Sequence, residues 1–181
     1  NVKWIVNKAQ NVGAASRRGY SGTPLVFGNH LICQVGSENN AGVVCFDKYN
    51  GKVIWKSSND LASYASPIMA EIAGKKQFIT LTTERLIGID IRNGNILWSE
   101  PVPTRAYRNV LTPVATGNSI IVASHSEGMI CVRGRGKNGE AILKWKNPKL
   151  KINLSTPVII GGFLYGFAEK DRFICVDTKT G

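Results

Sequence analysis

One spacing pattern recurs along the chain and constrains its fold more than any other feature. In CFDKYNGKVIW, residues 45–55, a small residue is followed two positions later by Asp, six positions later by Gly and ten positions later by Trp. GIDIRNGNILW, residues 88–98, keeps this spacing without error. A third copy, residues 131–145, carries insertions and has Arg133 in place of Asp, and a fourth, residues 175–181, ends at its Gly. We call these copies the first to fourth motif.

A second landmark recurs with the same period. A Ser/Thr-Pro pair opens an apolar run before each motif, and its prolines, Pro24, Pro67, Pro113 and Pro157, lie 43, 46 and 44 residues apart. Each period holds four short runs rich in Ile, Val, Leu, Phe or Thr, bounded by turn residues, which predict strands. A four-stranded unit repeated every forty-odd residues is the sequence signature of a β-propeller blade.

The sequence therefore predicts an all-β fold, a β-propeller segment of about four four-stranded blades. The Asn-Gly pairs of the first two motifs are strong hairpin signals, because a type I′ turn needs positive φ at both centres. Pro67 interrupts the only stretch that could be read as a helix, residues 59–76. We expect blades at residues 21–58, 64–101, 110–147 and 154–181, the last one truncated, with residues 1–6 ending a preceding blade.

The motif resembles the tryptophan-docking motif of the PQQ-like (quinoprotein-type, BamB-like) β-propeller repeat family. The resemblance covers essentially the whole chain and implies a larger ring, commonly of eight blades, in which each tryptophan packs flat between neighbouring blades. Half a ring would leave two blade faces open, so we expect this chain to be part of a longer protein. A homodimer that closes the ring is the weaker alternative. The residues to which the resemblance gives this structural role are Trp4, Cys45, Asp47, Gly51, Trp55, Gly88, Asp90, Gly94, Trp98, Cys131, Gly139, Trp145, Cys175, Asp177 and Gly181.

The residues that first suggest chemistry have structural interpretations. Three of the four cysteines occupy the slot that Gly88 fills in the second motif, which predicts a small buried residue there. Recurrence of the motif aspartates favours a turn-stabilising role. The two histidines, His30 and His125, are too few and too far apart for a usual metal cluster. We therefore expect no catalytic residue, no metal and no cofactor in this chain.

Charge and hydropathy restrict the partners. The formal net charge of +11 favours anionic surfaces or ligands. We predict no nucleic-acid binding, because the basic residues are scattered and no recognisable module is present. No apolar stretch reaches the roughly 20 residues that a membrane-spanning helix needs. A targeting segment is absent from the sequence, which does not begin with Met, so its absence does not indicate a compartment.

The loops that lead from each outer strand to the next inner strand are the best functional candidates. They should converge on the mouth of the central channel, and each carries Arg, Lys, Tyr or Asn close to the Ser/Thr-Pro pair. Such a funnel would suit an acidic peptide, a carboxylate or an anionic sugar, because Arg makes bidentate contacts to carboxylates. The candidate ligand-binding residues are Arg17, Arg18, Tyr20, Tyr64, Arg105, Tyr107, Arg108, Lys151 and Asn153.

We interpret the chain as a non-catalytic binding or scaffolding propeller that recognises a protein or an anionic ligand at the channel mouth. The resemblance implies an extracytoplasmic, periplasmic location. One alternative is a PQQ-dependent quinoprotein oxidoreductase, with PQQ and calcium bound by residues outside this segment. No two of the chain's cysteines are adjacent, whereas active family members have a disulfide between adjacent cysteines. The other alternative is an extracytoplasmic sensor domain.

Overall fold

The structure, a computed structural model, describes residues 1–7, 20–36, 39–105, 108–134 and 140–181. The described residues form strands, turns and loops, and none of them lies in an α-helix. The predicted all-β fold is confirmed. Within these ranges, no helix is long and apolar enough to cross a membrane.

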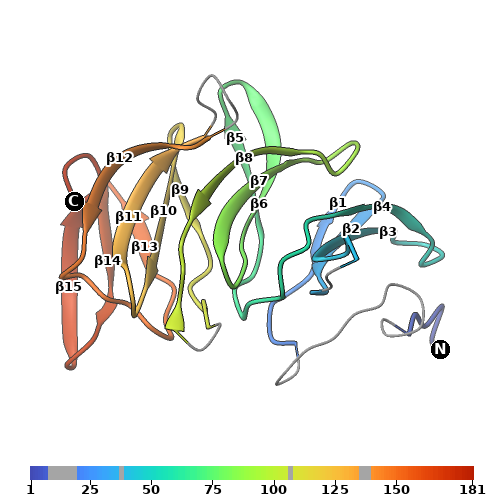
Figure 1. The fold of residues 1–181 in the computed structure, drawn as a ribbon, viewed down its shortest axis with the longest axis horizontal. Coiled ribbons are helices and arrows are strands. Elements are labelled where there is room, and N and C mark those ends of the chain that lie inside the picture. The colour runs from blue at the N-terminus through green and yellow to red at the C-terminus, as the bar shows by residue number, and fades with distance from the viewer. Residues whose placement is uncertain (8–19, 37–38, 106–107, 135–139) are drawn as a thin grey trace.

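The strands form four antiparallel sheets, which we number in chain order (Figure 1). Sheet 1 contains β1 (Leu25–Phe27), β2 (His30–Gln34), β3 (Val43–Asp47) and β4 (Val53–Ser57). Sheet 2 contains β5 (Ile68–Ile72), β6 (Lys75–Leu81), β7 (Arg85–Asp90) and β8 (Ile96–Pro101). Sheet 3 contains β9 (Val114–Thr116), β10 (Ser119–Ser124), β11 (Gly128–Arg133) and β12 (Ile142–Asn147). Sheet 4 contains β13 (Val158–Ile160), β14 (Phe163–Ala168) and β15 (Arg172–Asp177).

Each sheet is a meander whose strand order follows the chain. The motif hairpins of sheets 1 to 3 share one irregularity, a β-bulge directly after the motif's first residue: Cys45, Gly88 or Cys131. At the turns of the first two motifs, Gly51 and Gly94 have φ values of +73° and +78°, a conformation that glycine adopts without steric cost. Sequence spacing and bulge position therefore recur together.

The sheets follow one another across the molecule, and the apolar core lies between them (Figure 1). One continuous cluster joins sheets 2, 3 and 4, with Leu81, Val122 and Leu164 fully or almost fully buried within it. A second cluster joins sheets 1 and 2. Three four-stranded meanders and one three-stranded meander pack face to face. Such stacking is the architecture of propeller blades, so the predicted propeller segment is confirmed.

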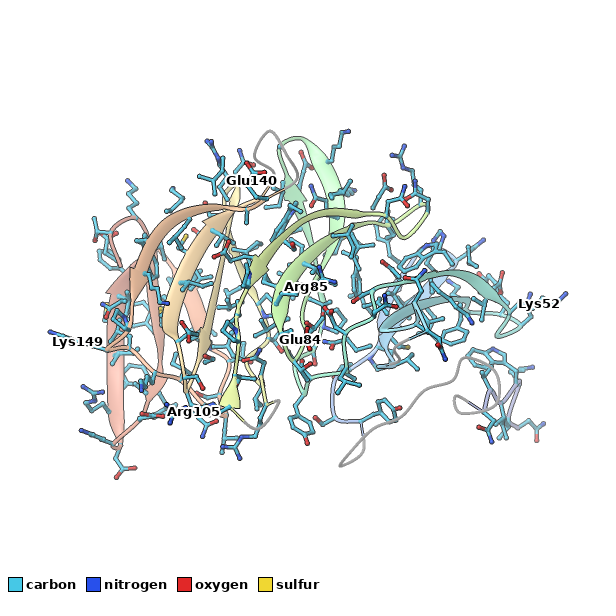
Figure 2. All side chains as sticks on the ribbon, viewed as in Figure 1. Lys52, Glu84, Arg85, Arg105, Glu140 and Lys149 are labelled. Carbon is cyan, nitrogen blue, oxygen red and sulfur yellow. The ribbon has the colours of Figure 1, made fainter. Side chains whose placement is uncertain are left out.

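The antiparallel strands give every sheet two distinct ends. We call one the loop end: it carries the loops between sheets and the turns that join the second and third strands of each sheet. The other, the turn end, carries the remaining hairpin turns, including those of the motifs. In Figure 2, the labelled Arg105 lies at the loop end and Glu140 at the turn end.

The outward face of sheet 4 is apolar and exposed. Phe167 and Phe173 are each 64% exposed and pack edge to face, with ring centroids 5.2 Å apart. Their counterparts in sheet 3, Ala123 and Met129, are buried against the neighbouring sheet. Sheet 4 thus exposes an apolar face whose equivalent in sheet 3 is buried against the next sheet.

Candidate functional site

Three of the motif tryptophans make the same hydrogen bond to the following motif. In each case the indole Nε1 donates to the backbone oxygen of the residue directly after the motif Asp. The bonds run from Trp4 to Lys48 (3.0 Å), from Trp55 to Ile91 (2.9 Å) and from Trp145 to Thr178 (2.9 Å). This contact gives the one polar atom of each ring an acceptor while its apolar surface is packed away.

The motif glycines lie against these rings. A β-carbon added at Gly94 would lie 2.7 Å from Cε3 of Trp55, and additions at Gly51 and Gly181 would meet the rings of Trp4 and Trp145 equally closely. No β-carbon fits at such distances without displacing the ring. The close approach therefore gives the recurrent glycine a structural reason.

The motif aspartates accept hydrogen bonds inside their own turns. Asp47 Oδ1 accepts hydrogen bonds from the backbone nitrogens of Tyr49 and Asn50. Asp177 Oδ1 accepts the equivalent bonds from the backbone nitrogens of Lys179 and Thr180. Asp90 also pairs with the Arg92 guanidinium at 2.6 Å. Hydrogen bonding to Arg92 lowers the pKa of Asp90 to about 2. These hydrogen bonds give the motif aspartates a turn-stabilising role.

The third motif departs from this arrangement. Trp98 is fully buried and donates to Gln77 Oε1 at 2.7 Å, within its own sheet. Its indole nitrogen lies beside Gly134, where an added β-carbon would approach within 2.5 Å. Arg133 occupies the aspartate slot and is exposed. Gly139, the predicted glycine of this motif, lies outside the described residues.

Cys45 and Cys131 are buried, whereas Cys33 and Cys175 lie in different sheets. Burial raises the pKa of the Cys45 thiol to about 12 and also raises that of Cys131. Cys33 and Cys45 lie on neighbouring strands, and Cys175 is exposed on sheet 4. None of the four cysteines forms a disulfide bond. In the described part of the chain, no group of three His, Cys, Asp or Glu residues has the arrangement to hold a metal ion.

At the loop end, a cavity of about 420 Å³ gathers charged side chains from three segments. The loop between sheets 2 and 3 contributes Arg105, and the loop between sheets 3 and 4 contributes Lys151. The β10–β11 turn adds His125, Ser126 and Glu127. The remaining lining residues are Pro103 and Thr104.

Hydrogen bonds hold the wall of this cavity in place. The Arg105 backbone nitrogen donates to Ser126 Oγ at 3.1 Å, and Ser126 Oγ lies 3.3 Å from His125 Nε2. Glu127 is paired with Lys146, whose Nζ lies 2.6 Å from Oε2. The other ring nitrogen of His125, Nδ1, is buried and has no hydrogen-bond partner among the described residues. The cavity thus combines two cations, a neutralised carboxylate and one unsatisfied polar atom.

Of the nine predicted ligand-binding residues, the structure brings Arg105 and Lys151 together at this cavity. Tyr20, Tyr64, Arg108 and Asn153 do not line it. Tyr20 is 39% exposed, the Tyr64 backbone nitrogen donates to Asn109, and Arg108 Nε and Asn153 Oδ1 are buried without a described partner. Arg17, Arg18 and Tyr107 lie outside the described residues.

Sequence reasoning did not identify the three cavity residues of the β10–β11 turn as candidate ligand-binding residues. They lie in a turn between two strands and not in a loop between blades. A usable signal was present, because antiparallel pairing puts the turn after every second strand at the same end as the inter-blade loops.

The comparisons with known proteins agree on the architecture. The family model described as "Outer membrane protein assembly factor BamB" matches residues 6–181. No curated protein matches the sequence significantly. BamB from Moraxella catarrhalis has a similar structure, with 13% sequence identity and a TM-score of 0.58 over 89% of this chain and 46% of that one. The present chain therefore spans less than half the length of that protein.

Two further solved structures share the fold. The computationally designed Ika4 protein has 8% identity and a TM-score of 0.60, over 90% of this chain and 95% of that one. The quinohemoprotein alcohol dehydrogenase ADHIIG from Pseudomonas putida HK5 has 14% identity and a TM-score of 0.58, over 93% of this chain and 34% of that one. Identities this low establish the fold alone. The family match over nearly the full sequence goes further: the chain belongs to the BamB family of PQQ-like β-propellers.

Proposed function

We propose that this chain is a non-catalytic binding module that recognises an acidic segment of a partner protein at its loop end. The observation that carries this proposal is the cavity that Arg105 and Lys151 share. The two residues come from loops on either side of sheet 3, so a ligand between them would contact both inter-blade connections.

The charge balance of the cavity supports an anionic ligand. Glu127 is the one acidic residue among those lining the cavity, and Lys146 already pairs with it. The positive charges of Arg105 and Lys151 therefore have no competing free carboxylate in the cavity wall. A guanidinium can form two parallel hydrogen bonds with one carboxylate, which favours Asp or Glu side chains of a partner.

A protein partner is also what the family description supports. The description names an outer membrane protein assembly factor. We infer from it that this chain acts in an extracytoplasmic, periplasmic setting and that its ligand is a polypeptide.

A peptide-binding measurement tests this proposal. Fluorescein-labelled hexaglutamate is titrated with the wild-type chain and with the double variant Arg105→Gln, Lys151→Gln, and anisotropy is recorded. Loss of two charge-assisted contacts should weaken binding about tenfold or more, equivalent to about 1.4 kcal/mol. The matched control, Lys52→Gln, Lys56→Gln, removes the same charge from the turn end and outer strand of sheet 1. Equal weakening in both doubles would show non-specific attraction by net charge and contradict the proposal.

The quinoprotein alternative makes a different prediction. A PQQ-dependent oxidoreductase requires a quinone site, and this chain's residues do not fit one, since its cysteines are dispersed over sheets 1, 3 and 4 and none are adjacent. Under that alternative the site would be supplied by other parts of a longer protein. Addition of PQQ and calcium to the full-length protein would then restore a quinone absorbance band, and its appearance would favour an enzyme over a binding module.

A further inference from the structure

A second cavity, of about 400 Å³, lies between sheets 3 and 4 at the turn end. Strand β10 separates it from the loop-end cavity: Ser119, at one end of this strand, lines the second cavity, and the residues directly after the other end line the first. The second cavity is lined by Thr116, Gly117, Asn118, Ser119, Arg133, Lys144, Gly162, Thr178 and Lys179.

The charges at this cavity come from the irregular third motif. Arg133 stands in the slot that holds an aspartate in the other three motifs. Lys144 is the additional residue of the β-bulge, a position filled by Ile54 in sheet 1 and Leu97 in sheet 2. Lys179 faces them from sheet 4. Three formal positive charges thus meet where the regular motif has one negative charge.

Nothing among the described residues neutralises these charges. The cavity lining contains no Asp or Glu, and none of the described ion pairs includes Arg133, Lys144 or Lys179. The nearby Asp177 accepts hydrogen bonds from backbone nitrogens inside its own turn and does not line the cavity.

A third basic cavity, at the turn end of sheet 2, provides a contrast. Lys75, Lys76 and Arg92 line a cavity of about 310 Å³ at the turn end of sheet 2. Asp90 also lines it and holds Arg92 in an ion pair with a separation of 2.6 Å. Asp90 offsets one of the three positive charges of that cavity, whereas the lining of the cavity between sheets 3 and 4 contains no carboxylate.

The walls of the cavity between sheets 3 and 4 are fixed and polar. Thr178 is almost fully buried, and its hydroxyl donates to the Gly162 backbone oxygen at 2.8 Å. Ser119 is also buried, in the register position opposite Arg133. A β-carbon added at Gly117 or Gly162 would meet no atom within 4 Å, so the cavity rim is open. A ligand can therefore enter without rearrangement of the backbone.

We propose that this cavity binds a phosphate group. Three cations match a group with up to two negative charges, and the planar Arg133 guanidinium suits the geometry of phosphate oxygens. The hydroxyl group of Thr116 can supply an additional hydrogen bond. The volume exceeds that of a single phosphate ion and admits a small phosphate ester or a phospholipid headgroup. This site lies away from the proposed peptide site and does not depend on it.

The test uses inorganic phosphate and phospholipid vesicles as separate probes. Phosphate is titrated calorimetrically at constant ionic strength, and co-sedimentation is measured with phosphatidylcholine vesicles that contain phosphatidylglycerol. Whichever of the two probes binds the wild-type chain, the variant Arg133→Gln, Lys179→Gln should bind that probe at least about tenfold more weakly. The control Lys75→Gln, Lys76→Gln removes the same charge from the cavity that contains Asp90 and should change affinity less than about twofold.

Each outcome decides the proposal. Selective loss of phosphate binding in the Arg133, Lys179 double supports a soluble phosphate ligand, and selective loss of vesicle binding alone supports a lipid headgroup. Equal losses in both doubles would assign the binding to net charge and overturn the site. Absence of binding to either probe by the wild-type chain would also overturn it. The loop-end variant should bind phosphate normally, so failure here is distinguishable from failure of the peptide proposal.

Discussion

At Gly94, a side chain as small as a methyl group would meet the ring of Trp55. The same close approach links Trp4 with Gly51 and Trp145 with Gly181. Sheet 1 therefore meets sheet 2, and sheet 3 meets sheet 4, through a tryptophan ring that packs on a glycine with no β-carbon. The indole nitrogen adds a hydrogen bond to a backbone oxygen beside each glycine. The spacing of the motif is explained by this pair of contacts, because both must come from one tight turn.

We predict that Gly94→Ala destabilises the protein more than Gly74→Ala. Both glycines have positive φ, +78° and +73°, so the backbone strain of about 1–2 kcal/mol is common to both variants. An added β-carbon at Gly74 meets no atom within 4 Å, whereas at Gly94 it meets Trp55 at 2.7 Å. Overpacking should cost Gly94→Ala a further ~1–3 kcal/mol. Urea unfolding of the two variants measures this difference, and equal free energies of unfolding would contradict the contact's role.

At the scale of elements, a buried ion pair fixes the connection from β4 to β5. Asp60 in this connection is almost fully buried and accepts hydrogen bonds from Arg85 Nε at 2.9 Å and from Thr82 Oγ1 at 2.9 Å. Both partners belong to the β6–β7 turn and its flanks in sheet 2. The Thr83 backbone nitrogen also donates to the Leu61 backbone oxygen. The connection is therefore attached to the sheet that follows it.

We predict that Asp60→Ala lowers the free energy of unfolding by about 2–3 kcal/mol, because it removes a charged acceptor and leaves the half-buried Arg85 guanidinium without its carboxylate. The adjacent exposed carboxylate offers a control: Glu84→Ala should change stability by less than about 0.5 kcal/mol. Thermal or urea unfolding with both variants checks the prediction. If the two variants are equally stable, the ion pair does not hold the connection.

At the scale of the whole molecule, the propeller architecture could be predicted because its signal is repeated. Any one hairpin with an Asn-Gly turn is weak evidence, but Pro67 and Pro113 keep the same distance from their motifs as Pro24 does, within a few residues. Periodicity of two independent landmarks requires a repeated structural unit. Local patterns sufficed for the fold because each blade is built from contacts close in sequence.

The candidate sites were less predictable because they depend on register between segments. Arg105 and Lys151 were identified from their loops. They line one cavity with His125 only because the β10–β11 turn lies at the same end of the sheet as those loops. Pairing of Glu127 with Lys146 decides which charges remain free, and no sequence spacing indicates that pairing. Arg133 was visible as an exception to the motif, but the approach of Lys179 from sheet 4 followed only from the stacking of sheets.

The exposed face of sheet 4 allows a prediction for the 181-residue chain as a whole. Val158, Ile160, Phe163, Phe167 and Phe173 are between 43% and 67% exposed on this sheet, whereas monomeric proteins rarely expose large contiguous apolar patches. We expect this chain to enhance the fluorescence of an apolar dye such as ANS while it remains folded.

The double variant Phe167→Ser, Phe173→Ser should reduce that dye fluorescence by about half or more, since it removes two of the most exposed rings of the patch, which pack against each other. The matched control is Val26→Ser, Val53→Ser, which changes two exposed apolar residues of sheet 1, 56% and 40% accessible. Dye fluorescence and far-ultraviolet circular dichroism are recorded together, so that loss of the patch is separated from loss of the fold. An equal decrease in both variants would show that the dye binds apolar surface throughout the molecule, and the special status of the sheet 4 face would be rejected.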